Sequence, residues 1–196
     1  MTTLSNYDYV VLVDFSGSMA TVDAGKNDSR IKLVKESLTG FISELAAVDE
    51  DGIDVITFGG DLIQHHSGVK NAAIVDTIFG GRRVAGGTPT AEALAKAFGV
   101  AGKSDKPDFV VVFTDGEPNN RQAVKDVLVK QANAQANDGD LTVLFIQVGN
   151  DTSAGNFLAE LDDGLNAKFD IVDTVTQAQA DAFPTLQALI DKAIND

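Results

Sequence analysis

Oxygen-bearing side chains follow two apolar runs of the sequence. A loop of alternating carboxylate and hydroxyl residues follows Tyr9–Val13, and a Thr-Asp-Gly sequence follows Phe109–Phe113. A separate glycine-rich turn at 86–90 adds another hydroxyl. These groups could converge on one point, and oxygen-only ligand sets are typical of sites for hard cations. The candidate metal ligands are Asp14, Ser16, Ser18, Thr88 and Asp115.

The mixture of two carboxylates and three hydroxyls predicts an open metal site. Two carboxylates at one point repel each other unless a cation or a proton lies between them. Hydroxyl ligands coordinate a cation without cancelling its charge. If Asp14 and Asp115 act through bound water, the ion keeps an exchangeable position for a carboxylate from outside. We expect Mg²⁺, with Mn²⁺ or Ca²⁺ as alternatives.

Near-continuous apolar runs predict buried strands at five places in the chain. They lie at Tyr9–Val13, Ile53–Phe58, Phe109–Phe113, Leu141–Val148 and Phe169–Val172. Leu62–His66 follows a Gly-Gly-Asp turn and is expected to be an antiparallel edge strand. Helical periodicities separate the runs, and the last helix is expected to carry Pro184 in its first turn. The pattern predicts one α/β domain over 1–196, with a doubly wound, mostly parallel sheet and helices on both faces.

Composition narrows the classes of partner. The chain has 196 residues and a formal net charge of −14, which disfavours nucleic acid and anionic membranes. It has no cysteine, so thiolate metal sites and thiol catalysis are excluded. The sequence contains no leader pattern and no apolar run of membrane-spanning length, so we expect a cytoplasmic location. The sequence leaves the oligomeric state open.

The chain resembles a von Willebrand factor type A (VWA) domain with a complete metal-ion-dependent adhesion site. The resemblance is carried by Asp-x-Ser-x-Ser after the first strand, a distant threonine and a later Thr-Asp-Gly, and it covers essentially the full length. It implies a Rossmann-like fold and a protein partner whose Glu or Asp completes the coordination of the metal. Relatives inside prokaryotic cells often act as assembly modules. The resemblance therefore implies a protein-interaction module that is not an enzyme.

Other interpretations stay open at this stage. Asp14, Ser16, Ser18 or Thr88 could instead cap a helix or turn. A metal-assisted phosphohydrolase is the principal rival function, although Ser16 stands where such enzymes need an acid. A third possibility is a structural cation with partners on another surface. Arg82 and Arg83 either are ordinary solvated charges or attract an acidic partner, and the polar residues Thr21–Ser29 are expected to form a flexible rim.

Overall fold

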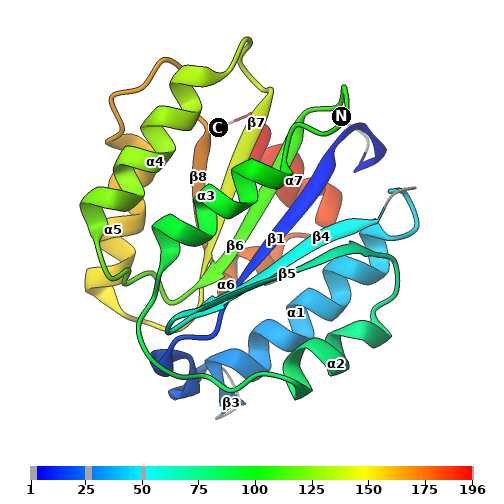
Figure 1. Cartoon of the computed structure of the whole chain (residues 1–196), viewed down its shortest axis with the longest axis vertical. Helices are drawn as coiled ribbons and strands as arrows, with labels where there is room; N and C mark the ends of the chain where they lie inside the picture. Colours follow the sequence, from blue (N-terminus) through cyan, green and yellow to red (C-terminus); the bar gives the residue numbers. More distant parts are fainter. Residues whose placement is uncertain (1–3, 25–27, 50–51, 196) are drawn as a thin grey trace.

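A six-stranded sheet lies at the centre of the structure (Figure 1). The computed structural model describes residues 4–24, 28–49 and 52–195. Within these residues the strand order is β5-β4-β1-β6-β7-β8, and every pairing is parallel except that of β5 with β4. This confirms the predicted Rossmann-like fold and its antiparallel edge strand. The strands are β1 (Asp8–Asp14), β4 (Ile53–Gly59), β5 (Leu62–Val69), β6 (Asp108–Thr114), β7 (Leu141–Gln147) and β8 (Val172–Thr176).

Helices cover both faces of the sheet (Figure 1). One face carries α3 (Thr90–Val100), α4 (Arg121–Ala134) and α5 (Thr152–Asp163). The other face carries α1 (Arg30–Leu45), α2 (Ala73–Gly80), α6 (Gln177–Ala182) and α7 (Leu186–Ile194). Side chains of β1 alternate between two apolar clusters, with Val11 in one and Leu12 in the other. Such burial on both faces explains why the strands are continuous apolar runs.

The strand order reverses at β1, which lies between β4 and β6. Val13 is level with Phe113 in the register of β1 and β6, so Asp14 and Thr114 end their strands side by side. Ligands of open α/β sheets bind beyond the carboxyl ends of the strands at such a reversal. The topology therefore places the two acidic loops of the sequence at the position where a ligand site is expected.

The last strand lies farther along the chain than its predicted place at Phe169–Val172. In the structure β8 begins at Val172, and its second residue, Asp173, is buried. Lys192 Nζ lies 2.5 Å from Asp173 Oδ1 and neutralises that carboxylate. A charged residue inside the strand interrupts the apolar pattern, which explains why the strand boundary was wrong.

The prediction for Pro184 was also wrong. Helix α7 begins at Leu186, and its cap is Thr185, whose hydroxyl accepts a hydrogen bond from the Ala188 N–H. Pro184 thus precedes the cap and lies outside the first turn. A separate short helix, α6, ends just before it at Ala182.

The predicted flexible segment Thr21–Ser29 contains two short paired strands. These are β2 (Val22–Ala24) and β3 (Asp28–Ser29), which pair in antiparallel fashion before α1. Residues 25–27 lie outside the described residues, so mobility of this rim stays a prediction. None of the helices in the described residues has the length and apolar character needed to cross a membrane.

Candidate metal centre

Asp14 is the last residue of β1 and is completely buried. Its Oδ1 accepts a hydrogen bond of 2.7 Å from the Ser16 N–H, and its Oδ2 accepts one of 2.7 Å from the Thr114 hydroxyl. Both oxygens are thus held by the ends of two neighbouring strands. The orientation of this carboxylate is fixed before any ligand binds.

The serines of the first loop face each other. Ser16 Oγ lies 3.1 Å from Ser18 Oγ, with Ser16 buried and Ser18 exposed. Ser16 precedes the 3₁₀-helix η2 (Gly17–Ala20), but its side chain makes no capping hydrogen bond. The capping alternative for Ser16 is therefore contradicted.

Main-chain hydrogen bonds join the first loop to the glycine-rich turn. The Gly17 N–H donates to the Gly86 carbonyl at 3.0 Å, and the Ala85 N–H donates to the Phe15 carbonyl at 2.9 Å. Gly86 has a φ of 70°, and a Cβ there would lie 2.6 Å from the Cα of Gly60. Only glycine fits this close approach without displacement of the backbone.

Thr88 is held by the loop that follows Asp115. Its N–H donates to Asn119 Oδ1 at 2.7 Å, and its carbonyl accepts from the Asn119 N–H at 2.9 Å. Helix α3 is preceded by Pro89, and no side chain caps it, which contradicts the capping alternative for Thr88. Thr88 is 6% exposed, and its hydroxyl makes no hydrogen bond with any other described residue. This hydroxyl is therefore available to a ligand.

Asp115 is buried and only half satisfied. Its Oδ2 accepts a hydrogen bond of 2.9 Å from Arg30 Nη1, whereas its Oδ1 has no hydrogen-bond partner in the described part of the chain. Arg30 also donates through Nε and Nη2 to the Asp23 carboxylate at 2.8 and 2.6 Å. The guanidinium thus connects the β2–β3 hairpin to the strand end that carries Asp115.

Burial raises the pKa of Asp14 to about 6. Desolvation is the main cause, hydrogen bonds from Ser16 and Thr114 lower the pKa in part, and the neighbouring charge of Asp115 raises it. The two carboxylates are therefore close enough to repel each other. A cation between them would relieve this repulsion and favour the ionised form of Asp14.

The residue types present fit a divalent cation. An unpartnered buried oxygen is unusual and calls for a ligand, and Asp115 Oδ1 is such an atom. The predicted ligand set, two carboxylates and three hydroxyls, consists of the hard oxygen donors that divalent cations such as Mg²⁺ and Ca²⁺ prefer. No described group of three or more His, Cys, Asp or Glu residues could hold a metal, so a cation here depends on the hydroxyls. Cation binding by the five residues stays a prediction.

Three residues of this centre were missed in the sequence. Thr114 was visible within Thr-Asp-Gly, but nothing in the motif indicates its hydrogen bond to Asp14. Asn119 lies in a loop of variable character, and Arg30 stands 85 positions before its partner Asp115. A polar residue that begins an amphipathic helix gives no signal of such a distant contact.

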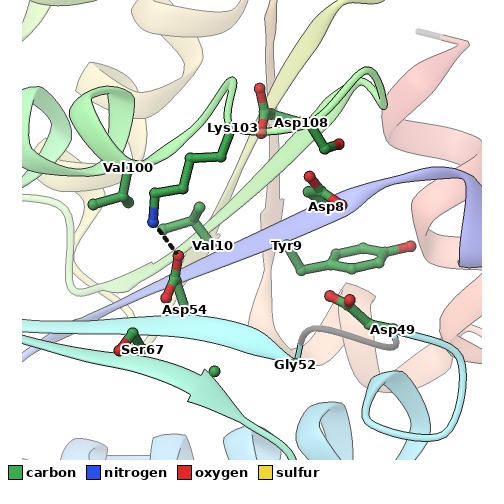
Figure 2. Close-up of a pocket in the computed structure, with 12 residues that line it drawn as sticks. Asp8, Tyr9, Val10, Asp49, Gly52, Asp54, Ser67, Val100, Lys103 and Asp108 are labelled. Atoms are coloured by element: carbon green, nitrogen blue, oxygen red, sulfur yellow. Dashed lines mark hydrogen bonds and ion pairs between the residues drawn. The ribbon is translucent and has the colours of Figure 1, made fainter.

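A cavity lies at the ends of the strands opposite to the candidate metal centre (Figure 2). It has a volume of about 220 Å³ and contains several carboxylates with partners inside the chain. Asp54 accepts from His65 and from Lys103, the latter at 3.2 Å, and Asp108 accepts from the Gly102 N–H. These contacts distinguish this cavity from the centre at Asp115, where a buried oxygen has no partner.

Comparison with protein families connects this geometry to a known domain. The sequence profile of the von Willebrand factor type A domain matches residues 8–181. The chain belongs to this family. VWA domains are often adhesion or protein-interaction modules. A comparison with curated protein sequences gives no match.

Solved structures show the same VWA fold at low sequence identity. The manganese-loaded TRAP protein of Plasmodium vivax is 18% identical, with a TM-score of 0.63 over 91% of this chain and 72% of that chain. The SpRpn10 VWA domain is 13% identical, with a TM-score of 0.64 over 94% of this chain and 92% of that domain. The pilus adhesin SpaC of Lactobacillus rhamnosus GG is 17% identical, with a TM-score of 0.59 over 97% of this chain but 30% of the adhesin.

Proposed function

We propose that this VWA domain binds a protein partner through a divalent cation. Mg²⁺, or Mn²⁺ or Ca²⁺ in its place, would be held by the five predicted ligands, and a Glu or Asp of the partner would complete its coordination. The bound ion would supply a positive charge that accepts the partner's carboxylate. The domain is then a binding module with no catalytic step.

The observation that carries this proposal is the unpartnered Oδ1 of Asp115. A buried carboxylate oxygen without a donor is costly, and a cation is the partner that its charge favours. The exposed Ser18 and the free hydroxyl of Thr88 lie on loops joined to the same strand ends. Two relatives support the proposal by what they are: TRAP was solved with manganese, and SpaC is an adhesin.

The phosphohydrolase alternative is less well supported. A nucleophilic aspartate needs an acid that protonates the leaving group, and Ser16 occupies the position two residues after Asp14. Both oxygens of Asp14 already accept hydrogen bonds from the protein. Turnover of a generic phosphate ester in Mg²⁺ that is abolished by Asp14→Ala would favour the enzyme instead.

The direct test is partner capture in Mg²⁺ and in chelator. We expect the immobilised domain to retain a protein from its source cells in Mg²⁺ and to release it in chelator. Thr88→Ala should lose most of this capture, because it removes a predicted ligand whose hydroxyl makes no hydrogen bond with a described residue. Thr39→Ala is the matched control, since Thr39 lies on α1 and donates to the Lys35 carbonyl.

Two outcomes would contradict the proposal. Equal capture in Mg²⁺ and in chelator would show that the cation is not at the contact and would favour the structural-cation alternative. If calorimetric titration with Mg²⁺ and Mn²⁺ gives no saturable heat, the domain does not bind these cations and the proposal fails.

A further inference from the structure

A half-open groove lies beside the candidate metal centre, between α1, α2 and the loop that follows α2. Its volume is about 480 Å³, which falls within the range of about 300–1,000 Å³ that proteins use for ligand pockets. We name it the basic groove. It is lined by Phe15, Ile31, Lys32, Lys35, Phe79, Arg82, Arg83 and Val84.

The floor of the basic groove is apolar and fixed. The Phe15 ring is buried, and its centroid lies 5.0 Å from that of the half-buried Phe79. Arg82 covers Phe15, with its guanidinium carbon 5.1 Å from the ring centroid. The nitrogens of Arg82 donate to the carbonyls of residues 57, 59 and 62. These hydrogen bonds hold the wall in place, so an occupant would meet a preformed surface.

The rim of the basic groove is positive on a strongly acidic chain. Four of its eight lining residues are Lys or Arg, although the formal net charge is −14. Lys32 and Lys35 pair with Asp28 and Asp76. Arg82 instead donates to neutral oxygens, and Arg83 is exposed and has no ion pair with a described residue. The arginine side of the rim therefore keeps its positive charge.

The basic groove is directly adjacent to the proposed ligands. Phe15, in its floor, is the residue after Asp14, and its carbonyl accepts the Ala85 N–H beside Val84. A segment of protein that lies in the groove meets both arginines, because Arg82 and Arg83 line it. Complementary charge on that segment would hold it there, and an apolar side chain on it would be covered by the floor.

We propose that the partner of this domain carries a second anchor for the basic groove. The partner is an acidic protein segment in which a large apolar side chain, preferably aromatic, stands close to the carboxylate that reaches the metal. The apolar side chain occupies the groove against Phe79 and Val84, beside the Arg82 guanidinium that covers Phe15, and further acidic residues face Arg82 and Arg83. This inference rests on the proposed function, because it names the chemistry of the same partner.

The test uses two short acidic peptides that differ at one central position. One has phenylalanine between glutamates, and the other has alanine there. Each is titrated into ¹⁵N-labelled domain in MgCl₂ and in chelator. We expect the phenylalanine peptide to bind about tenfold more tightly in both buffers and to shift the amide signals of Ile31, Phe79 and Val84. The tenfold difference corresponds to about 1.4 kcal/mol.

A pair of charge reversals tests the rim. Arg83→Glu should weaken the phenylalanine peptide about fivefold or more, because it replaces an unpaired cation of the groove with an anion. Lys96→Glu makes the same change in charge at an exposed position of α3, on the opposite face of the sheet, and should leave binding within about twofold. Equal effects of the two variants would show that only general electrostatic attraction acts on the peptide. That result would overturn the assignment of the peptide site to the basic groove.

The two buffers separate this inference from the proposed function. Equal affinity of the two peptides, shifts confined to other residues, or no saturable binding of the phenylalanine peptide would overturn the groove. If the phenylalanine peptide is preferred but Mg²⁺ adds no affinity to either peptide, the groove stands and the cation-dependent function fails. If Mg²⁺ strengthens both peptides alike and phenylalanine gives no advantage, the function stands and the groove fails.

Discussion

Replacement of Arg30 by glutamine tests the centre most sharply, because Arg30 and a cation would share Asp115. Arg30 Nη1 lies 2.9 Å from Asp115 Oδ2, and the exposed fractions of the two side chains are 10% and 3%. Removing one partner of a buried ion pair costs about 3–5 kcal/mol, because the other charge stays buried. The contact with Asp23 adds little, since that side chain is 31% exposed.

In chelator, Arg30→Gln should therefore lower the free energy of unfolding by about 3–5 kcal/mol. For a domain of this size such a loss lowers the melting temperature by about 10 °C. Mg²⁺ should reverse part of the loss, because both oxygens of Asp115 would then be free for the cation. If the dissociation constant for Mg²⁺ falls tenfold, saturating Mg²⁺ adds about 1.4 kcal/mol more stability to the variant than to the native chain.

The assay is urea unfolding followed by circular dichroism, in chelator and in MgCl₂. Arg30→Lys is the control, because lysine keeps the charge but cannot bridge Asp23 and Asp115 with a planar fork. It should show an intermediate loss in chelator. The reasoning is refuted if Arg30→Gln is as stable as the native chain in chelator, or if Mg²⁺ stabilises the two chains by the same amount.

Three further predictions concern neighbouring positions. The pKa of Asp14 in the folded chain, about 6, lies above its ordinary value of 3.8, so without metal the native stability falls as pH rises between these values. Asp14→Asn in chelator should therefore gain stability relative to the native chain between pH 4 and pH 7, on the order of 3 kcal/mol by urea unfolding. Thr88→Ala should weaken Mg²⁺ binding by about fivefold or more in calorimetric titration, and should change stability by less than about 1 kcal/mol. Gly86→Ala should destabilise the fold by more than Gly102→Ala, because both glycines have φ near 70° but only Gly86 meets another backbone.

Each of these predictions has an outcome that contradicts it. If the stability of Asp14→Asn relative to the native chain does not change with pH, the pKa of Asp14 in the folded chain is not raised. Unchanged Mg²⁺ affinity in Thr88→Ala would remove Thr88 from the ligand set. Equal melting temperatures for the two glycine variants would show that the contact between the Gly86 turn and Gly60 contributes nothing beyond backbone conformation.

The sequence predicted the parts of the fold and site that depend on local patterns. Continuous apolar runs predicted the central strands, because burial on both faces leaves no polar position in the strand. The loops after β1 and β6 could be predicted for the same reason, since a carboxylate after such a run lies at a strand end. The order of the strands then brings Asp14 and Thr114 together.

Contacts between distant segments could not be predicted in this way. Arg30 begins an amphipathic helix and gives no local indication that it pairs with Asp115. Asn119 holds Thr88 through two hydrogen bonds that depend on where two loops meet. Asp173 interrupts the apolar pattern of the last strand. Its neutralising partner, Lys192, lies on the last helix and is not evident from the sequence around Asp173. Each of these contacts can be recognised only once the distant segments are seen together in the folded structure.

The hydrogen bonds that join the first loop to the glycine-rich turn use main-chain atoms only. The Gly17 N–H donates to Gly86, and the Ala85 N–H donates to Phe15; the turn between β4 and β5 joins the same glycine-rich turn through the Gly60 N–H, which donates to Gly87. These three hydrogen bonds do not use the side chain of Arg83. Substitution of the exposed Arg83 should therefore alter the choice of partner while the main-chain links between the loops are kept.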